Sequence, residues 1–271
     1  MSDEILTIPL MKTAWKYVAA AIIVTVILSL MVALDVRSSN VRSERTCSGI
    51  KVEFADQKGL DFVTEKDVRK YVDEVCGTCS GKRVEELDLA GIEAHVDGKS
   101  AVKKSEVYVT KDGVLHVMIS QREPVVRFST PSGGWYSDED GYLFPLQKNY
   151  TSRVPIVDGN VPVRLPGKDF SGVPSKAAER MWLQGIIGLV DYLSTHRQWN
   201  EAVTQIHVDG RGRIILVPRR GKEKFIFGRP EDMERKFAKI EDYYRYIVPE
   251  KGEGYYSTVN VSYDGQIVCR K

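Results

Sequence analysis

The longest apolar run of the chain lies near its N-terminus. Residues 17–34 have the sequence YVAAAIIVTVILSLMVAL, which contains no charged side chain. A helix of this length covers roughly 27 Å at about 1.5 Å per residue, close to the hydrocarbon thickness of a bilayer. Trp15, Lys16 and Tyr17 stand at its start, and aromatic and basic residues favour the membrane interface. The pattern predicts a transmembrane helix over residues 17–36.

Two other interpretations of this run are open. A cleavable signal peptide normally has an apolar core of about 7 to 15 residues, and the candidate cleavage site after Ala33 has the bulky Met31 at its minus-three position. A buried helix of a soluble domain is the other alternative, although no second run of this apolar length occurs in the chain. Length and cleavage site both favour a membrane anchor.

The residues around the predicted span indicate its topology. Basic residues flank it on both sides and so favour neither orientation: Lys12, Lys16, Arg37, Arg42 and Arg45. Residues 1–16 are too few to fold by themselves, whereas most of the chain and all four cysteines follow the span. We therefore expect a short cytoplasmic tail over residues 1–16, a linker over residues 37–45, and the functional part on the other side of the membrane.

A first folded domain is expected over residues 46–124. Ile50, Val52 and Phe54 alternate with charged residues, which predicts a strand. Thr64 and Asp67 have capping-box-like spacing at the start of a helix that Gly77 ends. The remaining predicted elements are a helix over residues 84–96, a strand over residues 102–110, a turn over residues 111–113 and a strand around residues 115–120. The predicted order is strand, helix, helix, strand, strand.

A second domain is expected over residues 125–271, after Pro124, which cannot donate to a strand ladder. It begins with a short predicted hairpin that has an acidic, solvated turn at residues 138–141. Residues 154–159 then lead into a Pro- and Gly-rich loop. The next predicted elements are a helix over residues 175–195, with a core stripe of Trp182, Ile186, Leu189 and Leu193, and strands over residues 203–208, 213–218 and 224–228.

The last predicted elements are a helix and a hairpin. Pro230 is expected as the first residue of the helix, whose buried face contains Met233, Phe237, Ile240 and Tyr244. A loop over residues 249–254 follows. The hairpin consists of a strand over residues 255–263, a tight primed turn at Asp264 and Gly265, and a final strand over residues 266–270. We expect the outer edge of this final strand to be exposed.

Composition excludes some classes of function. The net charge is only +2, which argues against a nucleic-acid-binding protein. The densest basic stretch is interpreted as a solvated turn: Arg219, Arg220, Lys222 and Lys224. Cys76 and Cys79 have the spacing of a redox or zinc pair, but no second pair and no nearby histidine accompanies them. A local disulfide and two free thiols both remain open for this pair.

No catalytic constellation is found. The four histidines lie in or beside predicted regular elements, and the chain has no nucleophile elbow, zinc-protease helix or phosphate loop: His95, His116, His196 and His207. Asp138, Glu139 and Asp140 do not have the spacing of an EF-hand. We therefore predict that the protein is not an enzyme and has no catalytic, cofactor-binding or metal-ligating residues and no small-molecule substrate.

Several segments occur in a distinctive order along the chain. These are the N-terminal span, the strand-helix-helix-strand-strand unit with its hairpin at Val107–Leu115, the exit Arg122-Glu123-Pro124, and WYSDEDGYLF at Trp135–Phe144. Together they resemble the FtsQ/DivIB family of bacterial cell-division proteins. The resemblance implies an α+β protein with one N-terminal transmembrane helix, a POTRA-like domain, and a second α+β domain with a mostly antiparallel sheet. It also implies an inner-membrane protein at the division septum, with its domains in the periplasm.

The resemblance further implies a scaffold that joins early division proteins to the septal peptidoglycan synthesis machinery. Its expected partners are FtsB-like and FtsL-like proteins. In this family the last strand of the second domain is the docking edge for FtsB, which corresponds here to Gln266, Ile267, Val268, Cys269 and Arg270. Tyr263 matches an aromatic residue that some members use in this contact. Arg270 stands where a tryptophan is used, so the chain departs from the family at that position.

Two other functions fit parts of the pattern. A POTRA-bearing scaffold for secretion or outer-membrane assembly usually has POTRA modules in series or before a barrel, and neither pattern follows Pro124. An anchored cell-wall enzyme would need a catalytic constellation. The division scaffold accounts for more of the sequence than either.

Overall fold

The structure of the chain, a computed structural model, describes residues 21–34, 45–55, 59–131, 133–164, 167 and 169–271. The predicted tail over residues 1–16 and the linker up to residue 44 lie outside these residues. The predicted span is described over residues 21–34, which are helical. Among the residues that the structure describes, no helix combines the length and the apolar character needed to cross a membrane.

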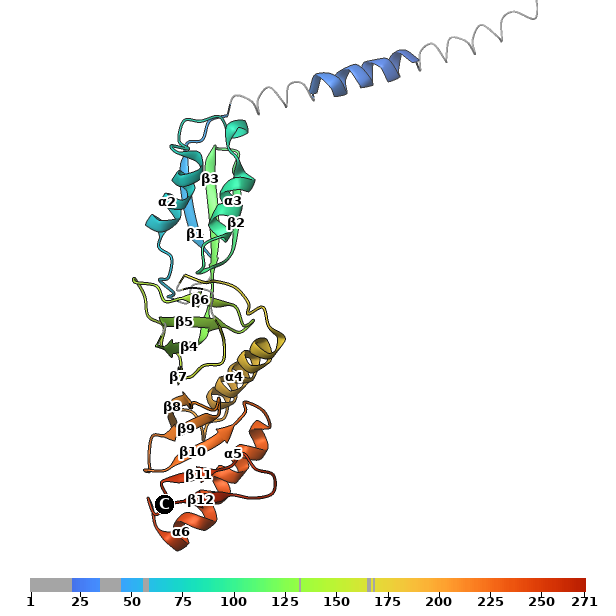
Figure 1. The fold of residues 1–271 in the computed structure, drawn as a ribbon. Coiled ribbons are helices and arrows are strands. Elements are labelled where there is room, and N and C mark those ends of the chain that lie inside the picture. Colours follow the sequence, from blue (N-terminus) through green and yellow to red (C-terminus); the bar gives the residue numbers. More distant parts are fainter. Residues whose placement is uncertain (1–20, 35–44, 56–58, 132, 165–166, 168) are drawn as a thin grey trace, which may run out of the picture. The chain divides into compact units, whose positions relative to one another are not determined.

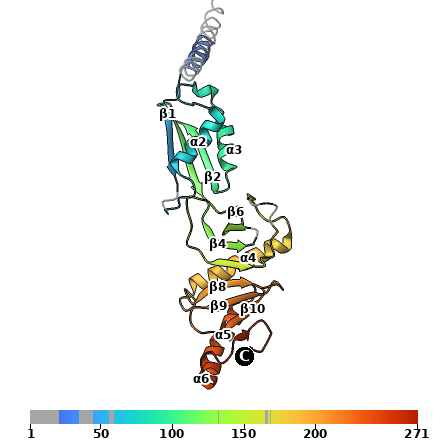
Figure 2. The same cartoon turned by 60° about the vertical axis from the view of Figure 1, so that its left-hand side comes forward.

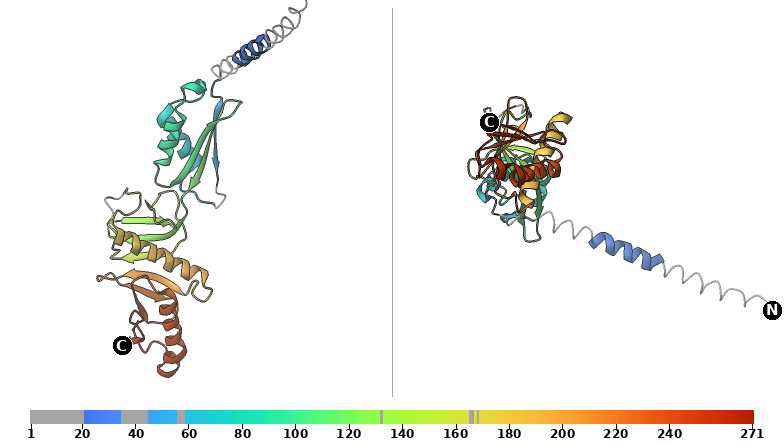
Figure 3. Two further views of the ribbon diagram at one scale, coloured as in Figure 1. Left: turned by 90° about the vertical axis from the view of Figure 1, so that its right-hand side faces the viewer. Right: turned by 90° about the horizontal axis from the view of Figure 1, so that it is seen from below.

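The chain divides into two compact units. Unit 1 contains the chain up to Glu53, Arg69–His95 and Glu106–Val117, and unit 2 contains Phe54–Val68, Val96–Ser105 and Met118–Lys271. The elements up to Gln121 are β1 (Gly49–Phe54), α2 (Glu65–Cys76), the 3-10 helix η1 (Val84–Glu86), α3 (Leu89–Asp97), β2 (Val102–Val109) and β3 (Val114–Gln121). The three strands form a sheet in the order β1-β3-β2, and α2 and α3 lie on one side of it (Figure 3, left).

Local sequence signals explain both ends of α2. The Thr64 N–H donates to Asp67 Oδ2 over 3.0 Å, and the Asp67 N–H donates to Thr64 Oγ1 over 3.3 Å. The predicted capping box is therefore confirmed. Gly77 ends the helix as predicted, with φ 63°, and its N–H donates to the Asp73 carbonyl over 2.8 Å.

The predicted single helix over residues 84–96 is wrong. The chain forms η1 and then α3, with a break at Asp88. Asp88 Oδ1 accepts a hydrogen bond from the Gly91 N–H over 2.8 Å, as the side chain of an N-cap residue does. Because Asp88 caps the start of α3, it separates α3 from the turn before it.

Unit 2 contains a sheet of nine strands. These are β4 (Pro124–Thr130), β5 (Gly133–Asp138), β6 (Leu143–Pro145), β7 (Ile156–Gly159), β8 (Val203–Val208), β9 (Ile214–Pro218), β10 (Lys224–Gly228), β11 (Thr258–Asn260) and β12 (Val268–Arg270). Their order in the sheet is β12-β11-β10-β9-β8-β7-β4-β5-β6, which can be followed strand by strand in Figure 1.

Helical crossovers explain two of the parallel contacts in this sheet. α4 (Ala177–Thr195) connects β7 to its parallel neighbour β8. α5 (Met233–Asp242), the π-helix η2 (Tyr243–Ile247) and α6 (Val248–Lys251) connect β10 to its parallel neighbour β11. Parallel neighbours require such connections. Five neighbouring pairs are antiparallel and three are parallel, so the predicted α+β domain with a mostly antiparallel sheet is confirmed.

α4 and α5 cover one face of the nine-stranded sheet (Figure 2). Their buried side chains join those of the strands in a single apolar cluster. The predicted core stripe of the α4 helix is confirmed for Ile186, Leu189 and Leu193, and Trp182 packs against the same cluster while partly exposed. Alternate strand residues such as Ile206 and Val208 complete the cluster, as expected for a sheet with one buried face.

Three further elements differ from the sequence predictions. Residues 154–159 were expected only to lead into a loop, but residues 156–159 form β7. The loop expected over residues 249–254 begins instead with α6 at residues 248–251. The helix expected to begin at Pro230 begins at Met233 instead, after Asp232 at φ 55°. Pro230 packs closely against Gly185 of α4, where an added Cβ would lie 2.5 Å from the Pro230 carbonyl oxygen. A side chain at position 185 would therefore force this segment to shift.

The predicted solvated turn at residues 138–141 is wrong for Asp138, which is only 2% exposed. Asp138 Oδ2 accepts a hydrogen bond from Arg122 Nη1 over 2.8 Å, and Asp138 Oδ1 accepts one from the Tyr142 N–H over 2.8 Å. The Arg122 guanidinium also lies 3.4 Å from the centre of the Tyr142 ring. A buried ion pair therefore joins the segment after β3 to the end of β5.

Candidate functional site

The candidate site is the end of the nine-stranded sheet formed by β12. Val268, Cys269 and Arg270 form this strand, and Gln266 and Ile267 precede it. β12 pairs with β11 on one side, with Val259 opposite Cys269, and it is the terminal strand of the sheet that the structure describes. The predicted position of the final strand at a sheet edge is confirmed, over three residues rather than five.

The chain turns at Asp264 and Gly265 as predicted, with Gly265 at φ 65°. The turn is not a tight hairpin turn, because the strands stop earlier and residues 261–267 connect them. Asn260 Oδ1 accepts hydrogen bonds from the Ser262 N–H over 2.9 Å and the Ser262 hydroxyl over 2.7 Å. Lys239 of α5 also donates to the carbonyls of residues 261 and 263. These side-chain bonds satisfy the main chain after Asn260, so it leaves the ladder with β12.

Backbone hydrogen bonding shows which residue of β12 faces outward. The Arg270 carbonyl accepts a hydrogen bond from the Ser257 N–H over 2.9 Å. The backbone groups of Arg270 therefore point toward the β11 side of the strand. In an antiparallel strand the N–H and C=O groups of one residue point to the same side, and successive residues alternate. Val268 therefore also faces β11, whereas the backbone groups of Cys269 face the open edge.

The side chains of this segment differ in exposure. Ile267 and Cys269 pack against the apolar cluster of unit 2, and burial raises the pKa of the Cys269 thiol. Tyr263 is 49% exposed, and Gln266 and Arg270 are exposed. The strand therefore has an anchored apolar side and a polar side, with Tyr263 in the connection that leads to it.

The other residues singled out from the sequence have local partners. Cys76 and Cys79 form a disulfide, which decides between the two interpretations of that pair, and Cys47 and Cys269 are free thiols. Within the described residues no group of three or more His, Cys, Asp or Glu side chains is placed to hold a metal ion. Three histidines pair with carboxylates and one with a main-chain carbonyl: His95 with Glu74, His116 with Glu53, His207 with Asp158 and His196 with Tyr192.

The sequence did not predict a pocket of about 750 Å³ beside α5. Its lining comes from separate segments around Trp199, Phe225 and Tyr244, each of which has the pattern of an ordinary core element or turn. The basic stretch that includes Arg219 and Arg220 was the single sequence signal near it, and that stretch was interpreted as a solvated turn.

Comparison with known families identifies both parts of the chain. Residues 123–270, more than half of the 271 residues, match the family described as "FtsQ/DivIB, C-terminal related". Residues 45–120 match the family described as "POTRA-like domain". No curated protein sequence matches the chain. The family matches confirm the resemblance found in the sequence: this chain belongs to the FtsQ/DivIB family and has a POTRA-like domain before its C-terminal domain.

Proposed function

We propose that this protein is a single-pass membrane scaffold of the bacterial division site. Its membership of the FtsQ/DivIB family supports a scaffold role in division. In this proposal residues 1–16 face the cytoplasm, residues 17–36 cross the inner membrane, and the two domains lie in the periplasm at the septum. The protein joins early division proteins to the septal peptidoglycan synthesis machinery by binding FtsB-like and FtsL-like partners, without catalysis.

The main structural support for partner binding is the open side of β12. A terminal strand presents unpaired backbone donors and acceptors, and an extended segment of another chain adds to such an edge as a further strand. At β12 the backbone groups of Cys269 face outward, while Val268 and Arg270 hold the strand to β11. We propose that an FtsB-like partner docks here and that exposed Tyr263 and Arg270 contribute side-chain contacts.

The proposed topology is tested by adding protease to spheroplasts. The C-terminal domains should be digested while the membrane remains intact, because they lie on the outer side of the inner membrane. The large apolar side chains of residues 22–34 are 51–63% exposed, as expected of a helix that lipid covers. Full protection of the C-terminal domains in intact spheroplasts would overturn the topology.

The docking edge is tested by a pair of variants at one position. Cys269→Pro removes the outward N–H, whereas Cys269→Ala keeps it and also removes the thiol. We expect Cys269→Pro to bind the FtsB-like partner at least two- to tenfold more weakly than Cys269→Ala, from one lost hydrogen bond worth about 0.5–1.5 kcal/mol together with steric obstruction by the ring. Capture of the partner by the full-length variants in detergent measures the difference.

Val268→Pro is the matched control for this pair. Its N–H faces β11, so the proline should remove a bond within the sheet and lower the melting temperature more than Cys269→Pro does. Equal partner binding by folded Cys269→Pro and Cys269→Ala would show that the β12 edge is not the docking site.

A further inference from the structure

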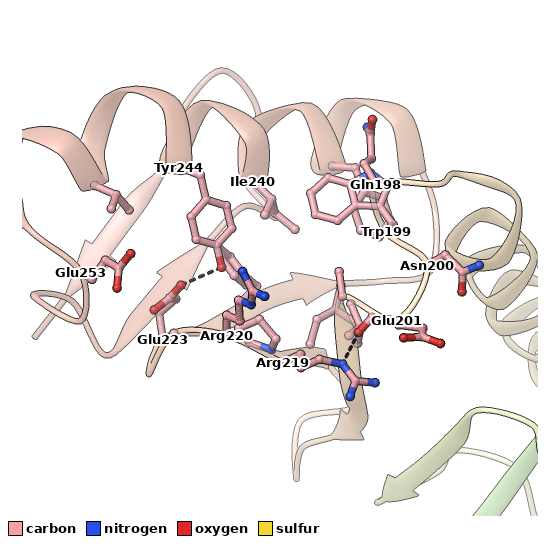
Figure 4. A pocket seen from close by; sticks show the side chains of 18 residues that line it. Gln198, Trp199, Asn200, Glu201, Arg219, Arg220, Glu223, Ile240, Tyr244 and Glu253 are labelled. Atoms are coloured by element: carbon pink, nitrogen blue, oxygen red, sulfur yellow. Dashed lines mark hydrogen bonds between the residues drawn. The ribbon is translucent and has the colours of Figure 1, made fainter.

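A second binding site is indicated by a pocket between α5 and the strands β9 and β10. We call it the α5 pocket. Its volume is about 750 Å³, within the range of about 300–1,000 Å³ that small-molecule sites occupy. Its apolar lining includes Trp199, Leu216, Phe225, Phe237, Ile240 and part of Tyr244. Figure 4 shows Tyr244, Ile240 and Trp199 on the helix side of the pocket and Glu223, Arg220 and Arg219 on the strand side.

The indole of Trp199 has an unused hydrogen-bond donor. Trp199 is 8% exposed and packs with its ring centre 4.7 Å from that of Phe237. Its Nε1 is buried, and no group in the described part of the chain accepts a hydrogen bond from it. Trp135 and Trp182 also have a buried Nε1 without an acceptor, so the state itself is not specific to this site. Because buried donors are normally satisfied and Trp199 lines the pocket, its Nε1 is a donor that a ligand acceptor atom would satisfy.

The carboxylate inside the pocket is already satisfied. Glu223 is 3% exposed, and it accepts hydrogen bonds from the Tyr244 hydroxyl over 2.7 Å and the Lys222 N–H over 3.0 Å. Burial, and then the bond to Glu223, raise the pKa of Tyr244, so its hydroxyl remains protonated as the donor. Glu223 therefore completes the wall of the pocket and needs no cation from a ligand.

The arginines at the mouth of the pocket have no carboxylate partner among the described residues. Arg219 Nε donates to the Glu201 carbonyl over 2.7 Å, which fixes the side chain and leaves its terminal nitrogens available. Arg220 is exposed beside it. In Figure 4 both arginines lie between Glu201 and Glu253, the carboxylates at the two ends of the mouth. An anionic group is the ligand chemistry that two guanidinium groups at one mouth favour.

Three departures from regular backbone geometry line the same pocket. Glu201 has φ 63° and Gly221 has φ 98°, and a Cβ on Gly221 would lie 2.4 Å from Glu223 Oε1. The π-helix η2 begins at Tyr243 and directs Tyr244 to Glu223. Positive φ at a non-glycine residue and π-helical turns are unfavourable and concentrate at functional sites. Their coincidence favours a ligand site over an accidental packing defect.

We propose that the α5 pocket binds a small amphiphile, with its apolar body against Trp199, Phe225 and Ile240 and its carboxylate or phosphate on Arg219 and Arg220. The proposal is independent of partner docking at β12, because it uses α5, β9 and β10 rather than the sheet edge. A carboxylate and a phosphate monoester share the required chemistry, and the experiment distinguishes them.

The experiment uses the full-length chain in lipid nanodiscs, with empty nanodiscs as the blank. Octanoate, octyl phosphate and octylammonium have the same apolar tail and differ in the head group. Calorimetric titration should show saturable binding of at least one of the two anions, at least tenfold tighter than that of octylammonium. The tighter of the two anions identifies the head group. Equal binding of all three, or binding by none above the blank, would overturn the proposal.

Variants separate the pocket from nonspecific binding. The double variant Arg219→Gln, Arg220→Gln should abolish the preference for an anion, whereas Arg211→Gln, an exposed arginine that does not line the pocket, should leave it unchanged. Val203→Trp should fill the pocket and remove binding of both anions. If the double variant binds octanoate and octyl phosphate as the wild type does, the arginines are not the anion site, and that result stands whether or not Val203→Trp folds.

Discussion

Replacing Asp138 with alanine should lower the free energy of unfolding by about 3–5 kcal/mol. The change leaves the Arg122 guanidinium, whose side chain is 12% exposed, without its carboxylate, and an unpaired buried charge has a cost of this size. The Tyr142 N–H loses an acceptor as well. Urea unfolding of the full-length chain in detergent, followed by tryptophan fluorescence, measures the change, because Trp135 lies in the same strand as Asp138.

Asp140→Ala is the matched control in the same turn. Asp140 forms an ion pair with Lys103 over 3.3 Å, but both side chains are largely exposed, and such pairs contribute about 0–1 kcal/mol. The double variant Asp138→Ala, Arg122→Met should be more stable than Asp138→Ala alone, since no unpaired charge remains. Similar small effects at positions 138 and 140 would contradict a structural role for the buried ion pair.

Phe237→Ala should lower the free energy of unfolding by about 3–5 kcal/mol, because it removes a large buried ring and leaves a cavity. Phe237 is 0% exposed. Its ring centre lies 4.7 Å from those of Tyr192 and Trp199 and 5.2 Å from that of Phe227. These residues belong to α4, the segment after it, and β10, so the loss should affect the whole of unit 2. Thermal and urea unfolding of the full-length chain provide the measurement.

Met181→Ala is the control for this substitution. Met181 lies on α4 and is 71% exposed, so its truncation should change stability by less than about 0.5 kcal/mol. Phe237→Leu should have an intermediate effect, because it keeps part of the buried apolar volume. If Phe237→Ala unfolds at the same urea concentration as Met181→Ala, Phe237 is not part of the stabilising core.

Elements specified by neighbouring residues could be predicted from the sequence. The capping box at Thr64 and the positive φ at Gly77 both depend on residues within one or two helical turns. The alternation of Leu115, Val117 and Ile119 was also sufficient to predict a strand with one buried face, since all three side chains are 0% exposed. In each case the physical cause is contained in a short window of the chain.

Elements specified by distant residues could not be predicted. β7 has only four residues and is held by β4 on one side and β8 on the other, which the intervening sequence places far away. Asp138 has the sequence pattern of a solvated turn, and only its pairing with Arg122 explains its burial. Tertiary contacts decide both structures, so local patterns did not reveal them.

The helix around Tyr243 shows a third reason why a sequence pattern predicts the wrong buried residue. A regular period of 3.6 residues places Tyr244 on the buried face, but Tyr243 is 1% exposed and Tyr244 is 37% exposed. The π-helix η2 changes the rotation between these residues and Ile240. Burial raises the pKa of Tyr243 to about 12, as expected for a ring within the core. A change of helical period is not visible in an apolar stripe.

The candidate edge was predicted in position but not in detail. Sequence order was enough to expect the final strand at the end of the sheet, and β12 lies there in the described part of the chain. The side chain of Asn260, which ends β11 early, and the outward phase of Cys269 required the structure. Partner binding by Tyr263 and residues 266–270 stays a prediction.

The shortness of β12 also affects selectivity. A long unpaired edge accepts almost any extended segment, including another copy of the same chain, and so promotes aggregation. β12 has three residues, of which Cys269 alone directs its backbone groups to the open side. So few main-chain bonds are too weak to retain an arbitrary strand. A segment that remains bound must therefore gain most of its affinity from matching side chains, which makes the edge discriminating and limits self-association of the chain.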